Sequence, residues 1–385
     1  MKRINYAVIG CGGRISGLIK EFADKKDVEL KGGWDPSTIN VTHMLKTLNK
    51  GEGKIYASYE ELVSDPEIDW VLIGSPNVFH REHIISAFKN GKHVFSEKPL
   101  ATTIEDCVAI NKSHQVSGKL FATGFTLRYA SIYRKAKEIL TSGKLGKVIS
   151  INASENIAPY HGAYIMKDWR RKKELSGPHI LEKCVHDLDL INWFTNSVPK
   201  RVAAFGGNDM FIPENNHLFK KNEEIFKTPS WVVIEESFEN SDTNPFLSDK
   251  SIEDNIVAVM EFVNGIRVQF QATMSNAIPE RRMYFHCTEG TLIIELYTGI
   301  LQYKSLEDEA VQMITLVGGG HGDGDYHIMK ELHDSMTHGT IPVCGGEEGL
   351  LSAVVGITID EAREKGSIVD LSDIWKSLGV GVVDE

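Results

Sequence analysis

The chain has 385 residues, of which 42% are hydrophobic and 25% are charged. That length exceeds what one hydrophobic core normally organises, so the composition predicts a globular protein of two domains. The formal net charge of −11 disfavours a nucleic acid or an anionic membrane as a partner, because both attract a basic surface.

The cysteines predict neither a disulfide framework nor a zinc site. They are five in number, widely spaced, and form no Cys-x-x-Cys pair: Cys11, Cys107, Cys184, Cys287 and Cys344. The N-terminus runs from Met-Lys-Arg directly into a strand-like segment, and no stretch reaches the length of a membrane span. These features predict a cytoplasmic protein with reduced cysteines.

Short apolar runs alternate with amphipathic stretches in the first third of the chain, which is typical of βαβ units around a parallel sheet. The expected strands are Ile4–Ile9, Val28–Asp35, Trp70–Gly74, His93–Ser96 and Leu120–Phe125. An apolar helix face follows the first strand, formed by Ile15, Leu18, Ile19 and Phe22. Residues 1–126 are therefore predicted to form a doubly wound Rossmann domain.

Longer β-rich runs begin after residue 145 and predict a different second domain. They are Val148–Ile157, Asn255–Phe262, Ile266–Met274 and Thr291–Glu295, and Asn264-Gly265 between two of them is a hairpin signal. We expect residues 127–385 to form an α+β domain on a large, mostly antiparallel open sheet, with a helix over 345–366 that packs back on the first domain. The polar residues 206–252 are expected to be an inserted loop, either a lid or a partly disordered excursion.

A glycine-rich turn, Gly10-Cys11-Gly12-Gly13-Arg14-Ile15, stands between the first strand and the first helix. Gly10 permits a tight turn, Gly12 lets the backbone approach a phosphate, and the helix N-terminus offers unpaired amides. Ile15 stands where the fingerprint has a third glycine, and Gly17 follows half a turn later. Asp35 ends the second strand, near the offset of about 20 residues at which a carboxylate binds the adenosine ribose. That carboxylate repels a 2′-phosphate, so NAD is favoured over NADP; the alternative is an ordinary glycine turn and a surface carboxylate.

Two further segments follow predicted strands: Gly74-Ser75-Pro76-Asn77-Val78-Phe79-His80 and Glu97-Lys98-Pro99-Leu100. Together with the glycine loop they resemble the glucose-fructose oxidoreductase, inositol dehydrogenase and MocA (Gfo/Idh/MocA) family, over nearly the whole chain. The resemblance implies that NAD(H) or NADP(H) lies between a Rossmann domain and an α/β domain. It also implies that Lys98 reaches both the nicotinamide and the reacting hydroxyl. The other expected cofactor neighbours in these segments are Ser75, Pro76, Asn77, His80 and Glu97.

Residues 179–195 are predicted to form one helix, in which Glu182, His186 and Asp189 fall on one face. A carboxylate beside His186 would orient the ring and favour its imidazolium form. On the residues of this helix alone, the solvated side of an amphipathic helix is the favoured interpretation. The family resemblance implies instead that His186 is an acid/base residue, with Glu182 at the position of the usual aspartate. Lys183 adds an amine that would serve substrate binding or proton transfer.

Several other residues are candidates for the same site. Trp169 and Arg170 match a family element near the cofactor or substrate, and Arg128 follows a strand end, with a structural ion pair as its alternative role. The loop Gly318–Tyr326 and the residue after it hold four alternating side chains that would share one side if extended: His321, Asp323, Asp325 and His327. Glycine density favours an irregular loop over a metal site. A related family loop implies that His321 and Asp325 contact the sugar.

The sequence thus favours reversible oxidation of a secondary alcohol on a sugar, a sugar derivative or a cyclic polyol. His186 would act as the base, Lys98 would polarise the oxygen, Glu182 would orient, and NAD would accept the hydride. Two alternatives remain: an NAD-dependent glycosidase that oxidises its sugar transiently, and a non-catalytic NAD-binding regulator. The family resemblance implies a homodimer or homotetramer.

Overall fold

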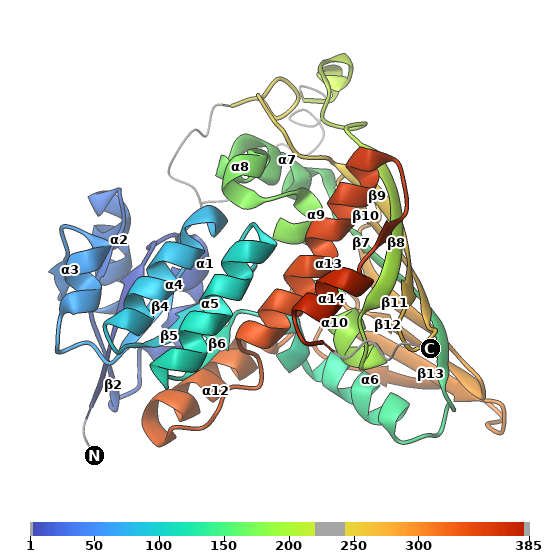
Figure 1. Ribbon diagram of the computed structural model, residues 1–385, viewed down its shortest axis with the longest axis horizontal. Helices are drawn as coiled ribbons and strands as arrows, with labels where there is room; N and C mark the ends of the chain where they lie inside the picture. Colours follow the sequence, from blue (N-terminus) through green and yellow to red (C-terminus); the bar gives the residue numbers. More distant parts are fainter. Residues whose placement is uncertain (1–2, 220–242, 381–385) are drawn as a thin grey trace.

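The computed structural model describes residues 3–219 and 243–380 (Figure 1). Its first domain is built on a six-stranded sheet in the order β3-β2-β1-β4-β5-β6, in which every neighbouring pair is parallel. The strands are β1 (Ile4–Ile9), β2 (Val28–Trp34), β3 (Lys54–Ile55), β4 (Trp70–Ile73), β5 (His93–Ser96) and β6 (Phe121–Thr123). The helices are α1 (Gly13–Ile19), α2 (Thr38–Leu48), α3 (Tyr59–Ser64), α4 (His80–Lys89) and α5 (Ile104–Ser117), with 3-10 turns at Lys20–Phe22, Asn77–Phe79 and Thr126–Tyr129.

The predicted Rossmann domain is confirmed. All four residues of β4 are buried, because helices cover both faces of the parallel sheet. The strand order reverses between β1 and β4, and in such sheets ligands bind beyond the carboxyl ends of the strands at that reversal. The glycine loop that follows β1 lies at this position.

Gly74, which directly follows β4, takes the role of the missing third glycine in the contact between α1 and β4. A Cβ atom added to Gly74 would lie 2.7 Å from the Cβ of Ile15, so the helix and the strand end approach as closely as the fingerprint requires. A Cβ added to Gly17 would meet no atom within 4 Å. The space is therefore supplied by Gly74 and not by Gly17.

The second domain is built on a nine-stranded sheet in the order β14-β13-β12-β11-β7-β10-β9-β8-β15. Its strands are β7 (Val148–Asn156), β8 (Pro199–Gly207), β9 (Asn255–Phe262), β10 (Arg267–Thr273), β11 (Glu280–Cys287), β12 (Gly290–Glu295), β13 (Ile300–Ser305), β14 (Gln312–Thr315) and β15 (Val369–Asp370). β7 and β10 pair in parallel and the other described neighbours pair antiparallel, which confirms the predicted mostly antiparallel sheet. Gly265 has a φ of 83° in the predicted hairpin between β9 and β10.

Helices cover one face of this sheet (Figure 1). Of these helices, α6 (Ser131–Thr141), α10 (Val185–Thr195) and α13 (Gly346–Lys365) contact its strands. The other helices in this part of the chain are α7 (Pro159–Lys167), α8 (Lys173–Ser176), α9 (His179–Glu182), α12 (Gly324–His338) and α14 (Ser372–Ser377), with 3-10 turns at Trp169–Arg171 and Pro213–Asn215. α13 lies against α5 and β6 of the first domain as well as against β8. α12 lies against α1 and β2. The C-terminal part of the chain thus ties the two domains together.

The predicted insertion 206–252 contributes a few buried residues to a second core where the structure describes it. Residues 206–207 continue β8, and Phe211, Phe246 and Ile252 are buried in a small second core with Met274. Aromatic side chains that are isolated in the sequence are brought together there. The central part of the predicted loop, residues 220–242, lies outside the described residues.

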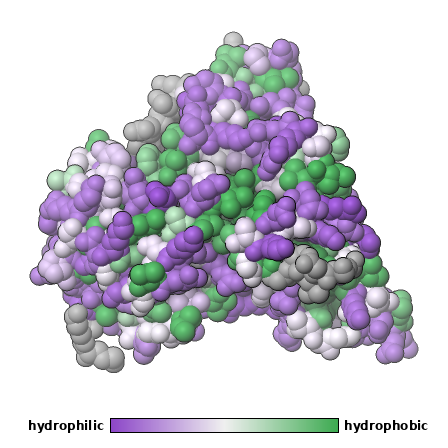
Figure 2. Space-filling model, viewed as in Figure 1, coloured by the Kyte–Doolittle hydropathy of each residue, from purple (hydrophilic) through white to green (hydrophobic). Residues whose placement is uncertain are grey.

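The exterior is mixed in polarity. In the view of Figure 2, polar residues cover most of the surface and apolar residues form small groups between them. Within residues 3–219 and 243–380, no helix has the length and apolarity needed to cross a bilayer. All five cysteines are free.

The Ile15–Gly74 contact predicts a stability effect. Gly74→Ala should lower the free energy of unfolding by about 1–3 kcal/mol, because the added methyl group overpacks the junction of α1 and β4. Combined with Ile15→Gly, which removes the Cβ atom that the added methyl group meets, the loss should be smaller than the sum of the single losses. Urea unfolding measures both. Gly17→Ala is the control and should be neutral or slightly stabilising; equal losses for the two glycine variants would refute this account.

Candidate active site

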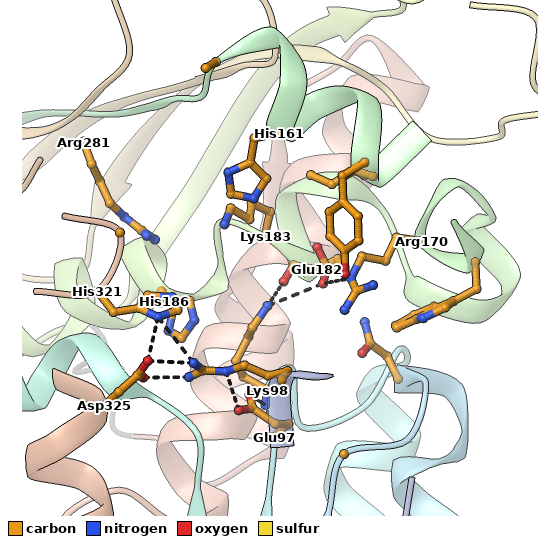
Figure 3. Close-up of a pocket in the computed structure, with 18 of the residues that line it drawn as sticks. Glu97, Lys98, His161, Arg170, Glu182, Lys183, His186, Arg281, His321 and Asp325 are labelled. Carbon is orange, nitrogen blue, oxygen red and sulfur yellow. Dashed lines mark hydrogen bonds and ion pairs between the residues drawn. The ribbon is translucent and has the colours of Figure 1, made fainter. Parts of the chain in front are cut away.

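A cavity of about 650 Å³ lies between the two domains (Figure 3). The first domain lines it with residues at the carboxyl ends of its strands: Arg14, Gly74, Ser75, Asn77, His80, Glu97 and Lys98. The second domain contributes a larger set, which includes Tyr160, His161, Tyr164, Trp169, Arg170, Glu182, Lys183, His186, Arg281, Tyr297, His321 and Asp325. Most of the predicted site residues therefore meet in one place. Ile15 is buried against Gly74 and does not line the cavity. The other predicted site residues that are not among the lining residues are Gly10, Gly12, Gly13, Asp35, Pro76 and Arg128.

The glycine loop has the shape that a dinucleotide requires. Gly10 has a φ of 78°, and a Cβ there would lie 2.4 Å from the backbone nitrogen of Ser75. A Cβ on Gly12 would meet nothing within 4 Å, so its backbone is open to a ligand. No side chain caps the N-terminus of α1, which begins at Gly13. An open backbone beside uncapped helix amides suits a pyrophosphate.

Asp35 follows β2 and also holds the glycine loop. Its Oδ2 accepts a hydrogen bond of 2.9 Å from the backbone N–H of Cys11, and its Oδ1 accepts one of 2.9 Å from that of Ser37. A carboxylate at this position can accept further bonds from ribose hydroxyls, because each oxygen has more than one acceptor direction. The residues present fit an adenosine ribose.

Lys98 and Glu182 meet across the cavity from different domains. The Lys98 ammonium donates a hydrogen bond of 2.5 Å to the Glu182 carbonyl oxygen and lies 3.5 Å from the Glu182 carboxylate. Arg170 Nε donates to the same carboxylate at 3.2 Å. Burial raises the pKa of Glu182, but Lys98 and Arg170 outweigh it and lower the pKa to about 2. Glu182 is thus an ionised carboxylate that holds two cations.

His186 has cations around it, and the predicted imidazolium is wrong. Burial lowers the pKa of His186 well below its usual range, and the positive charges of Lys98 and Arg281 lower it further. The chain turns at residues 183–184, so Glu182 ends α9 and His186 lies on a separate helix, α10. This break directs the carboxylate of Glu182 to Lys98. The predicted single helix over 179–195 is therefore also wrong.

The His186 ring also has two aromatic neighbours, Phe125 and His321. Its centroid lies 6.2 Å from that of Phe125 and 5.6 Å from that of His321. Its Nδ1 has no hydrogen-bond partner among the described protein atoms. A neutral imidazole in this setting is able to accept a proton from a bound molecule.

Asp189 and Arg128 form a structural ion pair, which corrects the predicted binding role of Arg128. Arg128 donates from Nε and Nη2 to the two Asp189 oxygens at 2.7 and 2.8 Å. Asp189 is 1% exposed. Burial raises the pKa of Asp189 to about 6, against the opposing charge of Arg128. The bidentate pair uses the Arg128 donors that would have been available to a ligand.

Arg14 links three parts of the chain at the other side of the cavity. It donates to Glu97 at 2.8 Å and to both Asp325 oxygens at 2.8 and 2.9 Å. Burial raises the pKa of Asp325, but hydrogen bonds with His321 and Arg14 outweigh it, so the carboxyl is ionised. Burial lowers the pKa of His321 to about 4.

The four alternating residues of the 318–327 segment do not share one side. α12 begins at Gly324, and Asp323 accepts a hydrogen bond from the backbone of Ser131. The helical start separates Asp323 from Asp325, which turns to Arg14. In the described part of the chain, no cluster of His, Cys, Asp or Glu has the arrangement of a metal site.

Trp169, Arg170, Asn77, Ser75 and His80 shape the remaining wall. The Arg170 guanidinium lies 4.5 Å from the Trp169 ring centroid. Asn77 donates to the Ser176 carbonyl at 2.8 Å, which joins the two domains. The ring nitrogens of His80 lie 2.8 and 2.9 Å from the carbonyl oxygens of Pro99 and Ser75, so His80 fixes both segments named in the sequence.

Sequence reasoning missed Arg281 and the aromatic residues of α7. Arg281 is 1% exposed and donates to both Asp187 oxygens at 2.9 and 2.6 Å. It alternates along β11 with buried Met283 and Phe285. Arg281 could have been found from the sequence, because it is a charged residue at a position of an amphipathic strand that otherwise holds buried apolar residues. No periodic signal marked Tyr160, His161 and Tyr164.

The Arg128–Asp189 pair predicts a stability effect that is separate from binding. Arg128→Met should lower the free energy of unfolding by about 3–5 kcal/mol, because it leaves a buried carboxylate without its partner. The affinity of the folded variant for NAD, measured by calorimetry, should stay within about twofold. The exposed Arg134→Met is the control, with a change within about 0.5 kcal/mol. A stable Arg128→Met variant that no longer takes up NAD would restore the binding role.

Two family models cover most of the chain. Residues 4–125 match the NAD-binding Rossmann fold of an oxidoreductase family, and residues 137–371 match its C-terminal alpha/beta domain. The 2,7-anhydro-N-acetylneuraminate hydratase of Escherichia coli (strain K12) is 30% identical over 206 residues, which are 53% of this chain and about half (53%) of that protein. The 1,5-anhydro-D-fructose reductase of Ensifer adhaerens is 24% identical over 334 residues, which are 83% of this chain and 85% of that protein.

Solved structures show the same fold. A levoglucosan dehydrogenase in complex with NADH and levoglucosan superposes with a TM-score of 0.77 at 18% identity, covering 96% of this chain and 100% of that one. The two domains matched by the family models correspond to the Rossmann sheet and the nine-stranded sheet of the structure. The chain belongs to the Gfo/Idh/MocA oxidoreductase family.

Proposed function

We propose that the chain is an NAD-dependent oxidoreductase that acts on a secondary alcohol carbon of a sugar, a sugar derivative or a cyclic polyol. The observation that carries this proposal is the meeting of Lys98 and His186, from different domains, in one cavity that adjoins the glycine loop. A neutral imidazole can accept the hydroxyl proton, and an ammonium can stabilise the negative charge that develops on the oxygen during alcohol oxidation.

A bound nicotinamide dinucleotide would supply the hydride acceptor or donor. Gly10, Gly12 and Gly13 would present backbone to its pyrophosphate, and Asp35 would hold the adenosine ribose. The remaining neighbours that we assign to it are Arg14, Ser75, Asn77, His80, Glu97, Trp169 and Arg170. Their place on the cavity wall supports this assignment.

Lys98 and His186 would share the work on the reacting hydroxyl. The neutral ring of His186 accepts the hydroxyl proton, and the Lys98 ammonium stabilises the negative charge that develops on the oxygen. Glu182 holds Lys98 in position through its carbonyl and its carboxylate. Lys183, His321 and Asp325 would bind other hydroxyls of the substrate.

The relatives narrow the substrates to be tried first. The names of the E. coli relative, the Ensifer relative and the levoglucosan dehydrogenase all refer to anhydro sugars. A second candidate function, redox-neutral turnover with catalytic NAD, is favoured by the first of these, because a hydratase adds or removes water without net oxidation.

The experiment is a panel of levoglucosan, 1,5-anhydro-D-fructose, D-glucose and myo-inositol with NAD(H), in which absorbance at the NADH band and product composition are followed together. Net change in NADH supports the oxidoreductase. New product without net NADH supports the redox-neutral reaction. Neither change, with NAD bound, would leave a non-catalytic regulator and refute the proposal.

The outer face of the nine-stranded sheet supports a further part of the proposal, a homo-oligomer. Phe205, Val257 and Val259 are exposed there on β8 and β9. Contiguous apolar residues on a sheet face are typical of subunit interfaces.

Lys98 and His186 give a prediction on pH. His186 acts as a base when neutral, and its pKa is lowered, so kcat/KM for alcohol oxidation should be flat down to pH 6.5 and fall only well below it. Lys98→Met removes a neighbouring positive charge and should raise the pKa of His186, which NMR titration of the ring measures. Both Lys98→Met and His186→Gln should lower kcat by about 10²–10⁴-fold. Full activity of His186→Gln would contradict the assignment.

Asp35 gives a prediction on cofactor choice. Asp35→Asn keeps an acceptor for one of the two amides, that of Cys11 or that of Ser37, and removes the charge that repels a 2′-phosphate. The ratio of kcat/KM for NAD to that for NADP should fall at least about tenfold, which is about 1.4 kcal/mol. The exposed Asp24→Asn is the control and should leave the ratio unchanged. A wild-type preference for NADP would contradict the proposed role.

A further inference from the structure

The cavity contains a second buried amine, that of Lys183. It enters from the second domain, beside His161, whereas Lys98 enters from the opposite side (Figure 3). The Lys183 side chain is 15% exposed, and its Nζ lies 3.7 Å from Oε1 of Glu155. At that distance it pairs with the carboxylate without a direct hydrogen bond.

Glu155 is a buried carboxylate with unused acceptor capacity. It is 1% exposed, on β7, and neither of its oxygens has a hydrogen-bond partner among the described protein atoms. Arg281 lies 3.2 Å away but directs two hydrogen bonds to Asp187. Burial raises the pKa of Glu155, but the positive charges of Arg281 and Lys183 outweigh it and lower the pKa, so Glu155 is an ionised carboxylate paired with both cations.

The groups around Lys183 act on its pKa in opposite directions. Burial lowers the pKa of Lys183, Glu155 opposes this, and the positive charges of Arg281 and Lys98 lower it again. The carboxylate of Glu182 favours the charged form, and the imidazoles of His161, His179 and His321 also face the amine. A buried amine with a lowered pKa can act as a proton acceptor in its neutral form.

We propose that Lys183 is a second proton-transfer residue of the site, with Glu155 as its positioning carboxylate, and that it removes the C–H proton from the carbon next to the newly oxidised carbon. The proposal rests on the proposed function, because only oxidation to a carbonyl makes that C–H bond acidic. His186 and Lys183 then serve two different protons of one substrate.

The step balances within the site. The neutral Lys183 amine takes the proton, the C–H bond breaks, and its electron pair moves to the carbonyl oxygen as an enolate. The Lys98 ammonium stabilises that oxygen. Return of the proton to carbon reverses the step, and NAD is the one oxidant needed. Glu155 keeps the amine in place through its negative charge.

The experiment follows deuterium from D₂O into levoglucosan and myo-inositol, with the full chain and NAD. Hydride transfer is measured separately as single-turnover NADH absorbance. In the wild type, recovered sugar should carry deuterium at the carbon next to the oxidised one. Lys183→Met should lower this incorporation at least about 100-fold, as loss of a general base does, and hydride transfer by less than about tenfold. Lys183→Gln should behave alike, and the exposed Lys112→Met should match the wild type.

The outcomes separate the two proposals. Hydride transfer without deuterium incorporation in the wild type overturns the role of Lys183 and leaves the proposed function in place. Unchanged incorporation in Lys183→Met, or equal loss of incorporation and hydride transfer, also overturns it. Absence of hydride transfer from either probe and from the panel refutes the proposed function, and this inference with it.

Glu155 is tested on the cofactor-free protein. Reductive methylation with formaldehyde and cyanoborohydride at pH 7, followed by mass spectrometry, gives the reactivity of Lys183. Glu155→Gln removes the charge that favours the ammonium form, so Lys183 should be methylated faster. The exposed Glu309→Gln should leave the rate unchanged. An unchanged or slower rate in Glu155→Gln overturns the positioning role.

Discussion

The contact between Lys98 and Glu182 is the interaction on which the arrangement of the site depends. One partner follows a strand of the Rossmann sheet and the other ends α9 in the second domain, and their side chains are 14% and 8% exposed. A pair so little hydrated is stable only if both members stay together, since removal of one partner typically costs about 3–5 kcal/mol. The contact therefore fixes the width of the cavity, and it places the proposed catalytic amine.

The same contact determines the state of His186. Because Glu182 is committed to Lys98 and Arg170, the imidazole faces positive charges and is neutral. A charged imidazole cannot accept a proton, and a carboxylate placed beside the ring would raise the pKa of His186 and so increase the fraction of the ring in that charged form. Glu182 and His186 lie on separate helices, and Lys98 comes from the other domain. In this arrangement the Lys98 ammonium can donate a hydrogen bond and the neutral His186 imidazole can accept a proton.

Much of the fold could be predicted from the sequence, because its signals are local. Fully apolar strands such as Trp70–Ile73 and the dipeptide Asn264-Gly265 encode burial and a tight turn in adjacent residues. The family motifs likewise placed Lys98 and His186 in one cavity. Partner choice was not predictable in this way. Glu182 had three candidate cations and a histidine within reach of the chain, and only the turn at residues 183–184 directs it to Lys98.

Arg128 and Arg281 also show that ion-pair partners could not be predicted from local sequence signals. Arg128 was a candidate for binding and instead forms a bidentate ion pair with Asp189 outside the cavity lining. Arg281 belonged to no recognised motif and lines the cavity. Both outcomes depend on contacts between residues that are distant in the chain, Arg281 meeting Asp187 and Arg128 meeting Asp189. Hydrophobic periodicity does not report such pairings, although an inward charge on a strand marks where one is needed.

The packing of α12 and α13 on the first domain has a consequence for biosynthesis. Domains generally fold as the chain emerges, the N-terminal one first. Here the faces of α1 and α5 are covered by helices that end only at His338 and Lys365. The Rossmann domain is therefore complete only when nearly the entire chain has been synthesised, and until then its apolar helix faces are exposed to chaperones and to aggregation.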